Sequence, residues 1–391
     1  MSGEKSAKGV LAALAVARVF YALNWLNIGS VFPPMAAEFG KGVTDLGVIT
    51  SSFYFGVGVF QLPGGAIAAR WGAKKTVLAG ISIYSACSLA TGLAPDVLFV
   101  ELLRFGVGVG MALIFAPMVV IVADAVRGEN SGVGVGVLNS AFDAGGILGL
   151  TWGVVALYVG WRYSFFISGA LGFLTLPFIY FIVPEFRSTG FRVTRRGLTR
   201  ILRNKNLFLI GLGLLSLDCG NTILGGFMVY YLSQKYALGL AEAGGIASLI
   251  VIVPIFFAII GGRAYDRLRR PKLLLLGADV AMGVSLFVCA VGGVGTAVVG
   301  TLLGGVATGI GFTVGFAAGR EANPNEREYE TLAVGWVNGL SLTGSVFPPL
   351  LFSFVTAGFG YTTGWLVGGT ATLLIAVPLL LMTEFPRSTA A

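Results

Sequence analysis

Residues 97–123 read VLFVELLRFGVGVGMALIFAPMVVIVA, an apolar run in which Glu101 and Arg104 are the only charged residues. A helix needs about 20 residues to cross a hydrocarbon core of about 30 Å, so this run predicts a transmembrane helix. The rest of the chain is similar, because its 391 residues are 56% hydrophobic and only 11% charged, with a mean hydropathy of +0.87. A soluble protein exposes far more polar surface than this composition provides. We therefore expect a protein embedded in a lipid bilayer.

Eleven further apolar runs accompany the first one. They lie near residues 9–36, 46–69, 76–94, 132–158, 163–183, 207–233, 243–264, 272–292, 295–319, 331–356 and 362–383. The runs are long and continuous, whereas the strands of a membrane β-barrel are about ten residues long and alternate in polarity. The sequence thus predicts an all-α membrane protein with twelve transmembrane helices.

The positions of the basic residues predict the orientation. The net charge is +8, but this excess does not indicate a nucleic-acid partner, because nearly all basic residues lie between the apolar runs or near the chain ends. With the N-terminus in the cytoplasm, all but five of the 26 lysines and arginines fall in cytoplasmic segments. Lys41, Arg162 and Lys235 lie in outer loops, and Arg18 and Arg104 lie within helices. This bias predicts a multi-pass protein of the cell membrane with both termini cytoplasmic.

The longest polar segment, residues 184–206, carries seven basic residues and divides the chain into six runs before it and six after it. We predict an N-terminal six-helix bundle (1–183), a cytoplasmic basic linker (184–206) that either lies on anionic lipid or binds a partner, and a C-terminal six-helix bundle (207–391). The halves resemble each other, since LNSAFDAGGIL from residue 138 matches VNGLSLTGSVF from residue 337. Such pseudo-symmetric duplication is typical of secondary transporters, in which the halves rock around a midplane site.

The composition argues against an enzyme. Histidine is absent, and Cys87, Cys219 and Cys289 all lie in apolar runs, where a reduced buried thiol is the usual state. No pairing of nucleophile and base is evident, and a histidine-based metal site is impossible. We expect no metal and no cofactor.

Several glycine-rich motifs carry a resemblance to the major facilitator superfamily, and it covers essentially the whole chain. The segment GAIAARWGAKK follows the second run and is similar to the family's basic loop through Gly65, Arg70, Gly72, Lys74 and Lys75. The equivalent segment of the second half, GGRAYDRLRRPK, contains Asp266 and Arg267. Helix 4 resembles the family through Arg104, Gly108 and Gly110, and helix 5 through Gly145, Gly149 and Gly153, with Leu150 replacing a proline frequent in exporters.

The resemblance implies an architecture and a gate. Helices 1, 4, 7 and 10 would line the cavity, and helices 2, 5, 8 and 11 would form the interface between the halves. The family's loop has an acid where this chain has Ala69, and that acid helps to latch the halves in the outward-facing state. We expect a weaker latch here, or one that uses Asp124, with Arg70, Asp266 and Arg267 as further gating residues.

Charged residues inside the apolar runs are candidates for function, because each costs at least about 2.5 kcal/mol to insert. Arg18 shares one face of helix 1 with Tyr21 and Trp25, with Asn24 at the border of that face. This face is a predicted binding site for an anionic group. The alternative is that Arg18 forms a structural ion pair, for which Asp218 is the candidate partner.

Each of the other candidate residues has two possible roles. On helix 7, Asp218 and Asn221 share a face, and Asp218 either takes up a proton when a solute competes for Arg18 or forms a permanent gate. Asp143 either contacts the solute or bridges the halves. Arg104 either binds the solute or is neutralised locally by Glu101.

These features together predict a monomeric secondary transporter that moves a small solute, an organic anion in our reading, by alternating access with proton symport. The alternative is an exporter of hydrophobic or cationic compounds, in which Asp143 and Asp218 would supply the negative charge.

Overall fold

We analysed a computed structural model that describes residues 7–125, 131–185, 195–322 and 330–383. Within these ranges every regular element is a helix. In chain order the elements are α1 (Ala7–Phe39), α2 (Val43–Trp71), α3 (Ala73–Thr91), α4 (Val97–Ala112), α5 (Phe115–Ala125), α6 (Ser131–Thr151), α7 (Gly153–Val159), α8 (Trp161–Ile182), α9 (Arg195–Leu202), α10 (Lys205–Tyr236), α11 (Leu240–Leu268), α12 (Pro271–Val291), α13 (Val294–Glu321), α14 (Glu330–Gly344), α15 (Phe347–Ala376) and the 3-10 helix η2 (Val377–Leu381).

By length and hydropathy alone, nine of the described helical segments are able to cross a membrane, or ten if the bent pair α6 and α7 is one span. One of these segments, Ala333–Leu381, has 49 residues and is long enough for two crossings. It is divided at Gly360, where φ is 83° and the backbone leaves the helical region. With α3 as a further, less apolar span, the described helices account for the twelve predicted spans.

Three predicted continuous spans are interrupted. The fourth is divided into α4 and α5, the fifth bends by 46° between α6 and α7, and the eleventh is interrupted between α14 and α15. Prolines account for only part of this pattern, because α1 runs unbroken through Pro33 and Pro34. Neighbouring helices in a membrane protein can satisfy the backbone groups that a proline frees.

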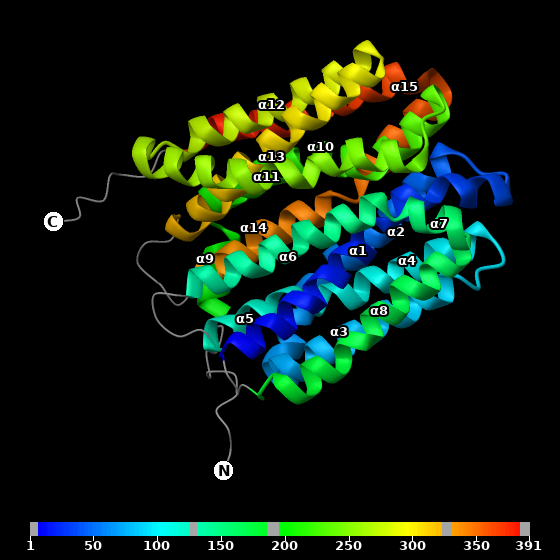
Figure 1. The fold of residues 1–391 in the computed structure, drawn as a ribbon. Coiled ribbons are helices and arrows are strands. Elements are labelled where there is room, and N and C mark those ends of the chain that lie inside the picture. Colours follow the sequence, from blue (N-terminus) through cyan, green and yellow to red (C-terminus); the bar gives the residue numbers. More distant parts are fainter. Residues whose placement is uncertain (1–6, 126–130, 186–194, 323–329, 384–391) are drawn as a thin grey trace.

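The helices form two groups joined by the segment that contains α9 (Figure 1). In the first group α1 packs on α6, α2 on α4, and α3 on α4 and α8; in the second, α13 packs on α11 and α12, and α15 on α10 and α12. Both chain ends lie at the same end of the molecule as α5 and α9, and α7 lies at the opposite end (Figure 1). The exact boundaries 1–183, 184–206 and 207–391 remain a prediction.

Glycines allow the helices of the first group to approach closely. A Cβ at Gly149 of α6 would lie 2.8 Å from the carbonyl oxygen of Leu23, and one at Gly153 would lie 2.5 Å from that of Ser30. The glycine motif of the fifth span therefore seats α6 and α7 against α1, within one half. Small residues serve this purpose in membranes because van der Waals packing drives helix association there.

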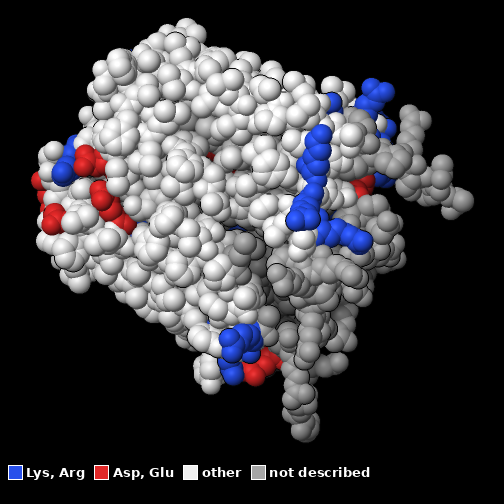
Figure 2. All heavy atoms as spheres, turned by 180° about the vertical axis from the view of Figure 1, so that it is seen from behind, with Lys and Arg blue, Asp and Glu red and all other residues white. Residues whose placement is uncertain are grey.

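The surface agrees with a membrane environment. In Figure 2 the charged side chains gather at the two ends of the molecule, and a broad band between them shows almost none. Large apolar side chains are exposed on this protein, among them Leu102, Phe178 and Phe256. A face of this kind is stable in lipid and would be a liability in water.

Candidate functional site between the two halves

One stripe of α6 shows where the halves touch and where they part. Asn139, Gly146 and Leu150 recur at i, i+7 and i+11, so they share a helix face. A Cβ at Gly146 would lie 3.3 Å from the side chain of Val251 on α11, and one at Gly244 would lie 2.6 Å from the carbonyl oxygen of Leu150. Asn139, nearer the start of α6, is exposed. The contact between the halves thus ends partway along the helix.

The stripe of α2 that faces α14 repeats this pattern. Ser51 donates a hydrogen bond of 2.7 Å to the carbonyl oxygen of Val346, and a Cβ at Gly58 would lie 2.8 Å from Cα of Thr343. Two turns further on, at Gly65, a Cβ would meet no atom within 4 Å. The halves are therefore in contact at the end where α1 finishes and α2 begins, and they separate toward the end that carries both termini and α9.

Arg18 of α1 lies in an aromatic setting. Its side chain is only 6% exposed, and its guanidinium carbon lies 4.2 Å from the ring centre of Tyr21, 4.7 Å from that of Phe142 and 4.9 Å from that of Phe115. Its Nε and Nη1 atoms are buried and have no hydrogen-bond partner among the described residues. Asp143 is the carboxylate whose charge acts on Arg18. Arg18 thus has a buried charge with unused N–H donors.

Asp218 of α10 has a different environment. It is 8% exposed, and it accepts a short hydrogen bond from the hydroxyl of Ser341 on α14. Among the ion pairs of the described residues, none joins Arg18 to Asp218. The alternative of an Arg18–Asp218 ion pair is therefore wrong for this conformation, because the two side chains point into separate clusters.

Tyr54 of α2 lies between these two clusters. The indole Nε1 of Trp25 donates to the Tyr54 hydroxyl over 3.4 Å, and the same hydroxyl lies beside Thr222 and near Asp218 on α10. Trp25 is half-buried, whereas Tyr54 is 7% exposed. Tyr54 therefore brings the predicted binding face of α1 close to the carboxylate of the other half.

Asn221, one turn beyond Asp218, is half-buried, and Thr308 of α13 donates to its Oδ1 over 3.5 Å. Asp143 is also half-buried and lies one turn from the exposed Asn139 on α6. Asp143 therefore lies near the point where α6 separates from the other half, and Asn221 contacts a helix of its own half.

Arg104 serves the packing of the first half. Its side chain is fully buried, it donates to the carbonyl oxygens of Asn24 at 2.9 Å and Trp25 at 3.4 Å, and it lies 4.8 Å from the ring centre of Phe53. Among the hydrogen bonds and ion pairs of the described residues none joins Arg104 to Glu101, so the structure gives no support to the alternative of local neutralisation. The geometry gives Arg104 a structural role, and its prediction as a solute contact has no support here.

Asn24 belongs to the same buried polar cluster. Its amide donates to the carbonyl oxygen of Ser168 at 3.1 Å, and its Oδ1 accepts from Ser88 at 2.6 Å. These bonds join α1 to α8 and α3, which again gives a packing role to a residue predicted to bind solute.

The predicted gating residues lie at the end where the halves separate. Arg70, Asp266 and Arg267 are exposed near the ends of α2 and α11. The side chains of Ala69 and Asp124 lie outside the described part of the structure, so the latch remains a prediction.

A bonded cluster that the sequence did not single out lies near Asp266. Glu321, at the end of α13, accepts from the hydroxyl of Tyr265 at 2.7 Å and pairs with Arg269 at 3.0 Å. This cluster ties α11 to α13 within the second half.

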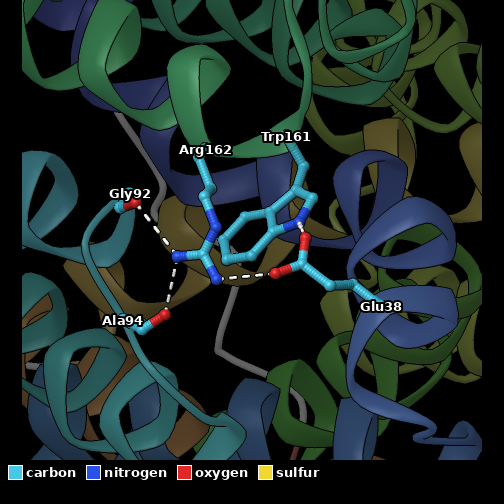
Figure 3. A network of polar contacts seen from close by, with 5 residues as sticks. All are labelled: Glu38, Gly92, Ala94, Trp161 and Arg162. Carbon is cyan, nitrogen blue, oxygen red and sulfur yellow. Dashed lines mark hydrogen bonds and ion pairs between the residues drawn. The ribbon is translucent and has the colours of Figure 1, made fainter.

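The opposite end of the first half carries another network that the sequence did not reveal (Figure 3). Glu38, at the end of α1, accepts from Trp161 Nε1 at 2.5 Å and from Arg162 Nη2 at 2.7 Å. Arg162 Nη1 also donates to the carbonyl oxygens of Gly92 at 3.3 Å and Ala94 at 2.7 Å. One arginine thus joins the end of α1, the loop after α3 and the start of α8.

The structure also adds aromatic residues to the site. Phe115, Phe142 and Tyr54 come from α5, α6 and α2, and the residue pattern of the first helix carries no information about them. The only sequence signal was that Phe142 precedes the candidate Asp143.

Comparisons with known proteins agree with this architecture. The Major Facilitator Superfamily profile matches residues 14–217 and 210–391. The multidrug efflux protein YfmO of Bacillus subtilis is 24% identical over 92% of this chain and 90% of its own length. The 3-(3-hydroxy-phenyl)propionate transporter of Escherichia coli is 26% identical over 39% of this chain. That match spans 38% of the transporter, and matches to several other relatives span a similarly small share of their length.

A solved structure shows the same fold. The nucleoside transporter NupG superposes with a TM-score of 0.81, at 14% identity, over 96% of this chain and 100% of that one. The family profile, together with the twelve-helix fold and its two halves, leads to one conclusion: this chain belongs to the Major Facilitator Superfamily and is a multi-pass membrane transporter, not an enzyme.

Proposed function

We propose that this protein moves a small organic anion across the cell membrane by alternating access, with both termini in the cytoplasm and with proton symport. The observation that carries the proposal is Arg18, a buried cation whose Nε and Nη1 have no partner within the described residues and which lies near the point where the halves separate. A buried charge with unused donors is costly, and an anionic ligand would supply the missing acceptor. The Escherichia coli relative is a 3-(3-hydroxy-phenyl)propionate transporter, and 3-(3-hydroxy-phenyl)propionate is a small organic anion.

Asp218 supports the proton part of the proposal. It is a buried carboxylate in the half opposite to Arg18, and its only hydrogen-bond partner among the described residues is the hydroxyl of Ser341. None of the ion pairs in the described part of the chain involves Asp218, and we infer that this carboxylate takes up and releases the coupled proton. We place the solute at Arg18, with Tyr21, Trp25 and Asn221 around it, and the proton at Asp218 or Asp143.

The second candidate is an exporter of hydrophobic or cationic compounds. It is favoured by the similarity to the multidrug efflux protein over nearly the whole chain and by the half-buried carboxylate Asp143 beside aromatic rings. In that case the carboxylate of Asp143 would bind the cationic compound, and Arg18 would only neutralise Asp143 in its absence.

The test begins with a screen of carboxylates, phosphates, sugars, amino acids and drugs for compounds that raise the thermal stability of the purified protein, since a bound ligand stabilises the native state. Transport of any hit is then measured in proteoliposomes for the wild type, Arg18→Gln, Arg18→Lys and the exposed control Arg203→Gln. We expect Arg18→Gln to reduce anion uptake by about tenfold or more, because a hydrogen bond to a charged group contributes roughly 1.5–3 kcal/mol.

Two results would contradict the proposal. One is wild-type anion uptake by the Arg18→Gln protein. The other is inhibition of transport by lipophilic cations and not by anions, which would establish the exporter.

A further inference from the structure

We propose that the anion bound at Arg18 is an aromatic one, whose carboxylate meets the guanidinium while its ring lies against Trp25 and Phe142. This inference rests on the proposed function and names the substrate class of the same site. It comes from the shape and chemistry of the surroundings of Arg18.

The guanidinium of Arg18 is surrounded by aromatic rings. Three rings, those of Tyr21, Phe142 and Phe115, lie 4.2–4.9 Å from its central carbon. Cations bind aromatic faces at such distances, but a ring face accepts an N–H group far more weakly than a carboxylate oxygen does, and only Tyr21 among the three also carries a hydroxyl that interacts with Arg18. The N–H groups of Nε and Nη1 are thus left for an incoming acceptor, and a carboxylate oxygen matches them.

Aromatic side chains also line the space next to Arg18. Trp25 lies 5.6 Å from Tyr21 and 5.9 Å from Phe142 between ring centres, and 4.8 Å from Phe53 behind it. Tyr21 and Phe53 are fully buried in this cluster, whereas Trp25 and Phe142 are half-buried and keep accessible surface. The accessible wall next to the cation is therefore aromatic.

Inorganic and aliphatic anions fit these surroundings less well than an aromatic carboxylate. Inorganic phosphate or sulfate would exchange its hydration for ring faces that donate no hydrogen bonds, which is unfavourable for a small, strongly hydrated ion. An aliphatic carboxylate would satisfy Arg18 but would lose the edge-to-face and stacked contacts that aromatic pairs make beyond area burial. A flat aromatic ring attached to one carboxylate uses both parts of the site.

The experiment compares ligands that differ only in aromaticity. Binding of benzoate is measured against cyclohexanecarboxylate, and 3-phenylpropionate against 3-cyclohexylpropionate, by ligand-dependent thermal stabilisation of the full-length protein. We expect the aromatic member of each pair to bind about fivefold more tightly, which corresponds to the usual increment for an aromatic pair. Inorganic phosphate and sulfate should give no stabilisation at the same concentrations.

The variants Phe142→Leu and Trp25→Leu should bring the two members of each pair to nearly equal affinity. Phe178→Leu is the matched control, because Phe178 is 52% exposed on α8 and lies outside the cluster. The preference should persist in that control. Arg18→Gln should weaken all four carboxylates together.

The outcomes separate this inference from the proposed function. Equal affinity for both members of each pair in the wild type, with loss of binding in Arg18→Gln, would overturn the aromatic site and leave the anion transporter standing. Unchanged preference in Phe142→Leu and Trp25→Leu would also overturn it. Binding of none of the carboxylates, or binding that Arg18→Gln does not affect, would overturn the proposed function itself.

Discussion

Arg104 and Arg18 are both buried cations of the first half, but their environments give them different roles. Arg104 donates from Nη1 and Nη2 to two backbone carbonyls of α1 and leaves only Nε without a partner among the described residues, whereas Arg18 leaves both Nε and Nη1 without one. Hydrogen bonds to its own bundle give Arg104 a structural role, and the lack of such bonds at Arg18 leaves donors for a ligand.

Replacing Arg104 should therefore affect stability more than binding. We expect Arg104→Met to lower the free energy of unfolding by about 2 kcal/mol, because it removes two charge-assisted hydrogen bonds in the interior. Thermal unfolding of the purified variant measures this loss. Wild-type stability combined with loss of ligand binding would instead identify Arg104 as a solute contact.

Asp218 carries the second prediction at this scale. Asp218→Asn keeps a hydrogen-bond partner for Ser341 but removes the titratable group, so solute uptake should no longer move protons into proteoliposomes that contain a pH-sensitive dye. Asp143→Asn is measured in parallel. Proton movement that persists in Asp218→Asn and disappears in Asp143→Asn would transfer the proton site to α6.

At the scale of elements, the closed end of the molecule depends on glycine. A Cβ at Gly47 of α2 would clash with Ser353 and would lie 2.9 Å from the carbonyl oxygen of Pro349, both on α15. The two helices belong to different halves, so their contact is available only while this end is closed.

Gly47→Ala should therefore destabilise the closed end. Overpacking typically costs 1–3 kcal/mol, so a reporter Thr50→Cys, 5% exposed in the wild type, should react with a maleimide about tenfold faster. The reporter cysteine is introduced into a protein in which the native Cys87, Cys219 and Cys289 have been replaced, so that only position 50 reacts. Gly339→Ala is the matched control, because a Cβ there meets no atom within 4 Å. Equal reaction rates in both variants would show that this packing does not hold the end closed.

At the scale of the whole molecule, the two ends differ in charge and in closure. The closed end bears Lys41, Arg162 and Lys235, which follow α1, begin α8 and end α10, whereas basic residues such as Arg70, Arg203 and Arg267 lie near the ends of helices at the open end. If the positive-inside rule holds, this conformation opens to the cytoplasm.

This orientation is open to direct measurement. In intact cells a membrane-impermeant maleimide should label Lys41→Cys and should label Arg203→Cys only after permeabilisation. A fluorescent protein fused to the C-terminus should fluoresce from the cytoplasm. The reverse labelling pattern would place the termini outside and would make the open end extracellular.

The twelve spans were predictable because hydropathy is a local property of the chain, and a span needs only enough consecutive apolar residues. The interruptions after Ala112 and Thr151 were not predictable, because they depend on neighbouring helices. Arg18 and Asp218 were identifiable because charges within apolar runs are rare. Their partners could not be chosen from the sequence, because the orientation of one helix face against another is not encoded by spacing along a single helix.

The sequence by itself determined that this protein lies in a membrane, that it is built from two related halves and that it belongs to a transporter family. These properties follow from composition, run length and short motifs. Only the tertiary structure decided that Arg104 bonds to backbone carbonyls within its own bundle, that Arg18 is surrounded by rings from α1, α5 and α6, and that the halves meet at one end. Each of these depends on contacts between segments far apart in the chain, which packing alone brings together.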